Sequence, residues 1–169
     1  MSGTFVQRLV SEQKLPLELT VLNGEPDGTF PKGRPDPLIP ENREEMIATL
    51  KAGSFDFGVA WDADADRCFF YTGAGEFIEG YYITALLAQV LLKKFPGQKI
   101  ICDPRTFWAV RDLTEQAGGT FLLNKCGHSF IKDRMWAEGA LFAGENSAHY
   151  YFRDNFFVDN GMIPFLLIA

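Results

Sequence analysis

Strand patterns and helix patterns alternate along the second half of the chain, and this alternation restricts its fold more than any other feature. Residues 99–102, 120–123 and 140–143 are short apolar runs typical of strands, while residues 106–117 and 129–138 between them have helical patterns. Strands separated by helices of this length form right-handed crossovers and a parallel sheet covered by helices. We therefore predict the α/β class, with mixed, mainly parallel sheets and helices on both faces.

The first half of the chain is organised differently. Residues 17–23 alternate like a strand, and a loop rich in proline and glycine follows them. Residues 41–52 predict a helix, because acidic residues occupy its first turn and Gly53 ends it. The apolar run 55–61 predicts a buried strand.

Two further elements mark the middle of the chain. Residues 68–72 and 76–78 resemble a hairpin around two glycines, and residues 80–95 predict a helix that ends before Pro96 and Gly97. We place a domain boundary between these elements, close to residues 75–80.

Composition excludes several classes of function. The net charge of −6 over 169 residues does not predict binding to nucleic acid. The three cysteines are far apart and form no CxxC pair, so we expect neither a disulfide framework nor a zinc knuckle, and we expect the cytoplasm. No apolar run reaches the roughly 18 residues of a membrane span. Because the chain stops inside the apolar run GMIPFLLIA, we expect a truncated protein that associates with missing domains or with itself.

The segment WDADADR at residues 61–67 has the sharpest pattern in the chain. Its carboxylates at Asp62, Asp64 and Asp66 follow a predicted strand at every second position, and they repel one another unless a cation is close. Carboxylate oxygens are ligands that Mg²⁺ accepts, and the guanidinium of Arg67 suits a phosphate. A calcium EF-hand is excluded, because its loop needs Gly and Glu where Arg67 and Gly73 stand. A solvated acidic turn remains the alternative.

Two more polar loops lie farther along the chain. Residues 125–129 (KCGHS) precede a predicted helix, with Ser129 as its expected N-cap, and backbone N–H groups at a helix start attract anions. Residues 144–149 (GENSAH) follow a predicted strand at the edge where open α/β sheets bind ligands. The carboxylate and hydroxyl of this second loop suit a vicinal diol, and its histidine suits proton transfer. An ordinary helix cap and an ordinary polar turn are the alternatives.

Taken in this order, the three loops resemble those of the α-D-phosphohexomutases. Residues 62–67 match the family's metal loop D-x-D-x-D-R, and residues 126–129 match its T-G-H-[SA] segment with Cys126 in place of Thr. Residues 144–149 match its sugar loop G-E-M-S-[GA]-H with Asn146 in place of Met. The flanking stretches EPDGTFP, FIEGYYI, DPR, HYYFRD and DNGMIP are also similar to bacterial phosphomannomutases, so the resemblance extends from about Leu17 to the end.

The resemblance implies a four-domain, Mg²⁺-dependent enzyme that interconverts hexose 1-phosphates and 6-phosphates through a phosphoserine and a bisphosphorylated sugar. It implies that residues 1–76 are part of the α/β/α domain II with the metal loop, and that residues 77–169 are most of domain III with the sugar loop. It also assigns roles to single residues: metal ligands Asp62, Asp64 and Asp66; catalytic residues His149, Arg67 and His128; substrate contacts Glu145, Ser147, Arg105 and Gly127.

The chain departs from the family pattern in two important ways. It contains neither a serine loop of the form T-A-S-H-N-P nor a C-terminal phosphate loop of the form R-x-S-x-T-E-P. We therefore expect a part of a phosphomannomutase or phosphoglucomutase that binds mannose or glucose phosphates and is inactive alone. A non-catalytic module that binds phosphosugar or metal, and a degenerate gene product, are the alternatives.

Overall fold

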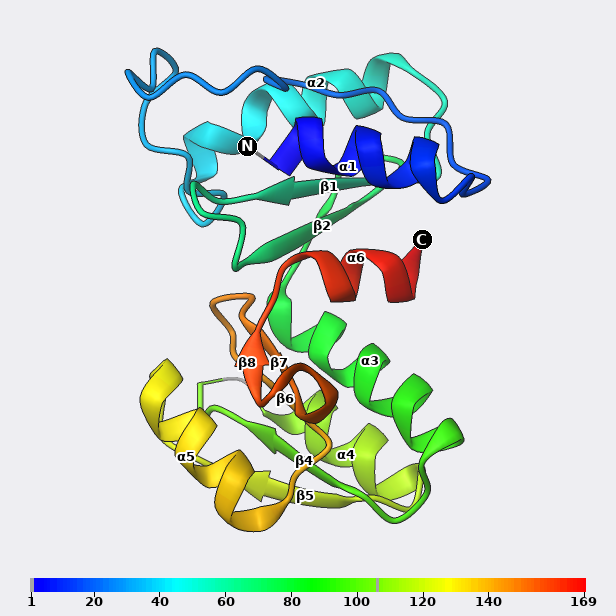
Figure 1. Ribbon diagram of the computed structural model, residues 1–169, viewed down its shortest axis with the longest axis vertical. Helices are drawn as coiled ribbons and strands as arrows, with labels where there is room; N and C mark the ends of the chain where they lie inside the picture. The colour runs from blue at the N-terminus through cyan, green and yellow to red at the C-terminus, as the bar shows by residue number, and fades with distance from the viewer. Residues whose placement is uncertain (1, 106) are drawn as a thin grey trace.

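The computed structural model describes residues 2–105 and 107–169, and within them the strands form a three-stranded and a five-stranded sheet. Figure 1 shows the two sheets one above the other, with the N-terminal part at the top. The mixed α/β class predicted from the sequence is confirmed.

The three-stranded sheet is antiparallel, in the order β1-β2-β3. Its pairing brings Trp61 opposite Cys68, so the acidic residues form the connection between β1 and β2. Helix α2 packs so closely on β1 that a Cβ atom at Gly58 would lie 2.8 Å from Leu50 Cδ1. In chain order, this part contains α1 (Ser2–Glu12), η1 (Pro40–Arg43), α2 (Glu44–Ala52), β1 (Phe57–Trp61), β2 (Cys68–Thr72) and β3 (Phe77–Ile78).

The five-stranded sheet is mixed, in the order β5-β4-β6-β7-β8. Parallel ladders join β4 to β5 and β6, and antiparallel ladders join β6 to β7 and β7 to β8. In chain order, this part contains α3 (Gly80–Lys94), β4 (Lys99–Cys102), α4 (Trp108–Gln116), β5 (Thr120–Leu123), α5 (His128–Glu138), β6 (Phe142–Gly144), β7 (Tyr150–Phe152), η2 (Arg153–Asn155), β8 (Val158–Asp159) and α6 (Met162–Ile168).

The expectation of mainly parallel sheets is therefore corrected for the described residues. Parallel pairing needs a crossover, and only the helical connections from β4 to β5 and from β5 to β6 provide one. The later strands are separated by short loops, which permit only antiparallel neighbours.

Helices cover both faces of the five-stranded sheet, as predicted. Side chains of successive strand residues point to opposite faces, so Ile100 and Cys102 join the core under α3 and α4 while Ile101 joins the core under α5. Alternate residues of β6 and β7 are divided between the same two cores. Continuous apolar runs are therefore required in these strands, which explains why the short-run pattern located β4 and β6, although β7 was not predicted.

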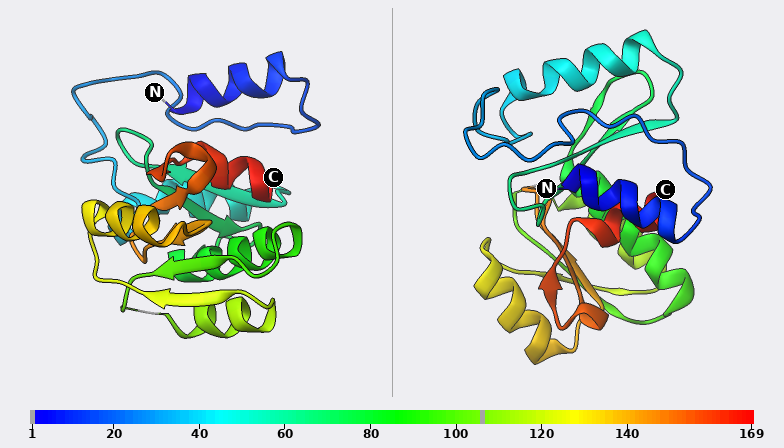
Figure 2. Two further views of the ribbon diagram at one scale, coloured as in Figure 1. Left: turned by 60° about the horizontal axis from the view of Figure 1, so that its bottom comes forward. Right: turned by 45° about the horizontal axis from the view of Figure 1, so that its top comes forward.

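Helix α6 connects the two sheets. It follows β8 in the five-stranded sheet, and it contacts β2 in the other. The indole Nε1 of Trp61 donates a hydrogen bond of 2.9 Å to the Gly161 carbonyl just before α6, and the ring of Trp61 meets that of Phe165 edge-on. Both views of Figure 2 show α6 beside α3. The two sheets thus share one hydrophobic core.

Most of the predicted elements are confirmed, and one is not. Residues 17–23 form no strand, because they run back beside α1 without a partner strand, with Thr4 Oγ1 bonded to the Gly24 carbonyl at 2.9 Å. The helix α1 itself was not predicted. The predicted helix 106–117 is observed as α4, but its first residue, Thr106, lies outside the described residues. No helix within residues 2–105 and 107–169 is both long and apolar enough to cross a membrane.

The shared core gives a stability prediction for two neighbouring leucines of α3. Leu87 is 0% exposed and Leu86 is 41% exposed. We expect Leu87→Ala to lower the free energy of unfolding by about 2–5 kcal/mol, because it leaves a cavity, and the control Leu86→Ala to change it by less than about 1 kcal/mol. Urea denaturation followed by circular dichroism measures both, and equal effects would contradict this description of the core.

Candidate functional site

The acidic loop is held by Arg67. Its backbone N–H donates to Asp62 Oδ1 at 3.1 Å and its Nε donates to Asp62 Oδ2 at 2.7 Å. Its Nη1 donates to Oδ1 of Asp36, a buried residue of the proline-rich loop, at 3.2 Å. Burial alone would lower the pKa of the Arg67 guanidinium, but the hydrogen bond and the charges of these two carboxylates outweigh burial and raise it. One guanidinium therefore pairs with two carboxylates and offsets part of their negative charge.

The carboxylates of Asp62, Asp64 and Asp66 are close together. Each offers an oxygen atom within 4.8 Å of the other two. Burial raises the pKa of Asp66; attraction by His149 opposes this, and repulsion by Asp62 and Asp64 adds to it. A set of hard oxygen donors with unbalanced negative charge fits Mg²⁺, so these three residues are suited to hold the ion that the sequence predicts.

The loop of residues 144–149 connects β6 to β7 in a tight turn. Ala148 N–H bonds to the Glu145 carbonyl at 3.0 Å, and Glu145 N–H bonds to the His149 carbonyl at 3.0 Å. The start of α3 lies directly against this turn, since a Cβ atom at Gly80 would come within 3.0 Å of the Asn146 carbonyl oxygen. A Cβ atom at Gly144 would likewise clash with Thr84 of α3. Both glycines are therefore required by close packing.

Glu145 is buried within this loop and is held at both oxygens. Oε1 accepts a hydrogen bond from Gly127 N–H at 2.9 Å, and Oε2 accepts one from the Tyr151 hydroxyl at 2.6 Å. Burial, followed by the hydrogen bond to Glu145, raises the pKa of Tyr151, so its phenol remains a donor. Glu145 thus connects the turn to the start of α5.

His149 lies between the two loops. Its Nδ1 is 3.0 Å from Ser147 Oγ, with which it shares a hydrogen bond, and 3.5 Å from Glu145 Oε2. Its Nε2 is 3.7 Å from Asp66 Oδ1. The backbones of Arg67 and His149 also form an isolated antiparallel bridge. The acidic loop and the 144–149 loop, which are far apart in the sequence, therefore form one site.

The third loop lies at the start of α5, and one detail of its prediction is corrected. The residue before the helix is Gly127, with φ of 114°, and the helix begins at His128. Ser129 is thus the second residue of the helix and not its N-cap. The positive φ favours glycine and turns the chain so that the Gly127 N–H reaches Glu145. The side chain of His128 is exposed.

Arg105 is joined to the 144–149 loop through Asp103, a fully buried residue after β4. Arg105 donates to both oxygens of Asp103, and the Asn146 N–H donates to Asp103 Oδ2 at 2.7 Å. Burial by itself raises the pKa of Asp103, but the hydrogen bonds from the Arg105 side chain, the Arg105 backbone and the Asn146 backbone outweigh burial and lower the pKa.

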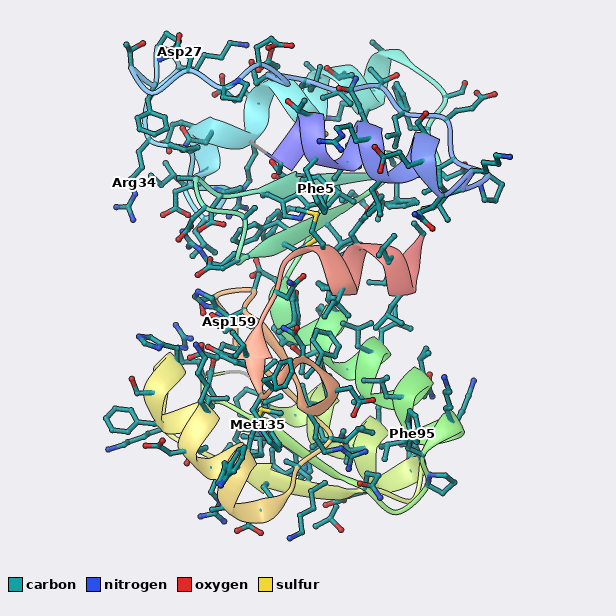
Figure 3. All side chains as sticks on the ribbon, viewed as in Figure 1. Phe5, Asp27, Arg34, Phe95, Met135 and Asp159 are labelled. Atoms are coloured by element: carbon teal, nitrogen blue, oxygen red, sulfur yellow. The ribbon has the colours of Figure 1, made fainter. Side chains whose placement is uncertain are left out.

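The structure therefore brings together most residues singled out from the sequence, and it adds four that were missed. Asp36, Asp103, Tyr151 and Asp159 each contact a site residue or lie beside one. Asp159 Oδ1 forms an ion pair with Lys132 Nζ at 2.8 Å. A carboxylate oxygen of Asp159, one of Asp66 and a ring nitrogen of His149 lie within 4.8 Å of one another. Asp159 belongs to β8 of the five-stranded sheet, and it is labelled in Figure 3. The segments RPDP, DPR, HYY and DNG contain these four residues, but a short segment of sequence does not indicate which residue of another loop each one contacts.

Comparisons with known proteins agree with this arrangement. The family model described as "Phosphoglucomutase/phosphomannomutase, alpha/beta/alpha domain II" matches residues 1–75, and that of domain III matches residues 79–169. A protein named "Phosphohexose mutases" from Xanthomonas campestris pv. campestris is 52% identical over 155 residues, covering 92% of this chain and 35% of its own length. A phosphomannomutase from Escherichia coli is 52% identical over 155 residues, covering 91% of this chain and 34% of its own length.

A solved structure from Burkholderia thailandensis, a phosphoglucomutase/phosphomannomutase family protein, has a TM-score of 0.92 at 34% identity, covering 99% of this chain and 36% of the other. The chain belongs to the phosphoglucomutase/phosphomannomutase family of phosphohexomutases. It spans about a third of the length of the curated relatives it matches.

The acidic loop gives a prediction for metal binding. Asp64 is exposed, whereas Asp62 is held by Arg67, so Asp64→Asn removes repulsion without breaking that ion pair. We expect the metal-free variant to be at least as stable as the parent chain. At ten times its Kd, Mg²⁺ should raise the Tm of the parent by about 3–5 °C and leave that of the variant unchanged.

Thermal melts of both proteins with and without Mg²⁺ test this prediction. The control Asp56→Asn, an exposed acid before β1, should keep the full effect of Mg²⁺. No shift in the parent chain would favour a solvated acidic turn.

The buried carboxylate of Asp103 gives a prediction for pH. Because its pKa in the folded chain is lowered from the ordinary 3.8, its stabilising effect is fully present above that value and is lost as pH falls through the lowered pKa. We expect Asp103→Asn to reduce the slope of unfolding free energy against pH below about pH 4. Urea denaturation at a series of acid pH values measures this slope. The control Asp154→Asn, at an exposed carboxylate outside the site, should leave it unchanged, and an unchanged slope in Asp103→Asn would contradict the assignment.

Proposed function

We propose that this chain supplies the metal loop and the sugar loop of a phosphohexomutase that interconverts hexose 1-phosphates and hexose 6-phosphates. Mannose and glucose phosphates are the proposed substrates. The reaction proceeds through a phosphoserine and a bisphosphorylated sugar. The names of the relatives, phosphohexose mutases and phosphomannomutase, support this class of reaction.

One observation carries the proposal: the bridge between Arg67 and His149, with Asp66 Oδ1 3.7 Å from His149 Nε2. A phosphoryl transfer to a sugar hydroxyl needs a cationic centre for the phosphoryl group and a proton acceptor for the hydroxyl at the same point. The bridge holds the loop suited to a cation and the loop suited to sugar hydroxyls at that separation.

In this proposal, the residues of the 144–149 loop orient the sugar. Glu145 is held at both oxygens by Gly127 and Tyr151, and its remaining lone pairs accept hydrogen bonds from a pair of sugar hydroxyls. Ser147 adds a third polar contact. His149, oriented at Nδ1 by Ser147, takes the proton of the attacking hydroxyl at Nε2. Arg105 and His128 bind the phosphate that is not transferred, next to Gly127.

In the acidic loop, Asp62, Asp64 and Asp66 would hold Mg²⁺, which when bound neutralises charge on the transferred phosphoryl group. Arg67 keeps Asp62 in place and limits the repulsion among the carboxylates.

The phosphate-carrying serine is proposed to come from outside these 169 residues. The sequence has no loop of the form T-A-S-H-N-P, and the chain corresponds to about a third of its relatives. We therefore expect the 169 residues to bind hexose phosphates and to show no mutase turnover on their own.

Binding of mannose 1-phosphate and glucose 1-phosphate in the presence of Mg²⁺, followed by NMR titration, tests the proposal. Glu145→Gln should weaken binding about tenfold or more, since a charged acceptor is lost. The amide can still accept from Gly127 N–H and donate to the Tyr151 hydroxyl, so the fold should be kept. The control Glu115→Gln, an exposed acid on α4, should have no effect.

Three outcomes separate the possibilities. Binding without turnover supports the proposal. Absence of hexose phosphate binding would reject it and favour a degenerate product. Turnover by the purified chain, lost in Glu145→Gln, would reject the requirement for an external serine.

A further inference from the structure

We infer that Asp103 is a positioning residue: it fixes the guanidinium of Arg105 and the 144–149 loop in one arrangement, and so sets the distance between a bound phosphate and the sugar hydroxyls. The inference rests on the proposed function, because it assumes that Arg105 binds phosphate and that Glu145 and Ser147 bind hydroxyls.

The carboxylate of Asp103 is shared between two segments. Oδ1 accepts hydrogen bonds from Arg105 N at 2.9 Å and Arg105 Nε at 3.1 Å. Oδ2 accepts from Arg105 Nη2 at 2.8 Å and from Asn146 N at 2.7 Å. Asn146 stands between Glu145 and Ser147. One rigid group of atoms therefore holds the cation and the centre of the sugar loop.

Exposure distinguishes this arrangement from an ion pair that only neutralises a buried acid. The side chain of Asp103 is 0% exposed, whereas that of Arg105 is 46% exposed. The pairing with Asp103 uses the Nε and Nη2 edge of the guanidinium, which directs the Nη1 edge away from Asp103. A guanidinium held in this way offers an anion a donor of fixed direction, which a mobile arginine does not.

The charges agree with the same role. A buried carboxylate that accepts four hydrogen bonds from N–H groups stays ionised, and its negative charge keeps the Arg105 guanidinium in place before any ligand binds. The Arg105 side chain then loses its conformational entropy on folding and not on binding, so its affinity for a phosphate rises.

A double-mutant cycle tests the inference. The probe is mannose 1-phosphate, titrated with Mg²⁺ into the 169-residue chain and the variants Arg105→Met, Asp103→Asn and the double variant. We expect each single variant to weaken binding about tenfold to a hundredfold. The double variant should be weaker than either, but by clearly less than the two single losses multiplied, because part of the effect of Asp103 acts through Arg105 and part through the 144–149 loop. Losses that multiply in the double variant would overturn the inference.

A second variant covers the case in which Asp103→Asn unfolds the chain. Arg105→Lys keeps the positive charge at a half-exposed position but cannot pair with both carboxylate oxygens in the same way. We expect it to lose nearly as much affinity as Arg105→Met. Parental affinity in Arg105→Lys would show that a point charge suffices and would overturn the inference.

A measurement without ligand separates this inference from the proposed function. In the parent chain, the Arg105 Nε–H resonance should exchange slowly with water and should show a single ordered environment. A rapidly exchanging, averaged signal in a chain that still binds hexose phosphate would overturn the positioning role alone. A chain that binds no hexose phosphate would overturn the proposed function and the inference together.

Discussion

The position of Arg67 between Asp62 and Asp36 is the interaction on which the rest of the site depends. Three acidic side chains within a few ångströms repel each other, by roughly 1 kcal/mol for each pair even in water-like surroundings. By pairing with one of them and with an acid from the proline-rich loop, Arg67 keeps the acidic loop compact and ties it to that loop. The same residue bridges to His149 through its backbone. Arg67 therefore both offsets negative charge beside the first sheet and contacts the second sheet.

The two sheets contribute to this site in different ways. The antiparallel sheet presents the acidic loop at a hairpin connection, where successive carboxylates come close because the chain turns sharply, with Ala65 in the left-handed region at φ of 62°. The mixed sheet presents its polar loops at the ends of β4 and β6, so Asp103 and the 144–149 loop are neighbours because their strands are. The core that contains Trp61 and Phe165 then fixes one sheet against the other.

The site residues that the sequence revealed are those that occur together in short motifs. Asp62, Asp64 and Asp66 are recognisable because three carboxylates at alternate positions after a strand repel one another, and residues 144–149 because polar groups are concentrated after a strand. Asp36 and Asp103 were missed because their importance depends on partners in other loops, which local spacing does not show. For the fold, apolar runs located β4, β5 and β6; β4 and β6 lie inside the sheet, and their burial on both faces requires such runs. The strand predicted at residues 17–23 was wrong, because an alternating pattern indicates an extended chain but not whether another strand pairs with it.

The glycines at positions 80 and 144 have a mechanical consequence. With no side chain at either position, the first turn of α3 rests on the backbone of the 144–149 loop with no space between them. A displacement of that loop must then be transmitted to α3 as a whole, and from α3 to α4, with which it makes its most extensive contact. Any adjustment to ligands of different shape would therefore occur as a rigid shift of a helical layer and not as flexing of the loop.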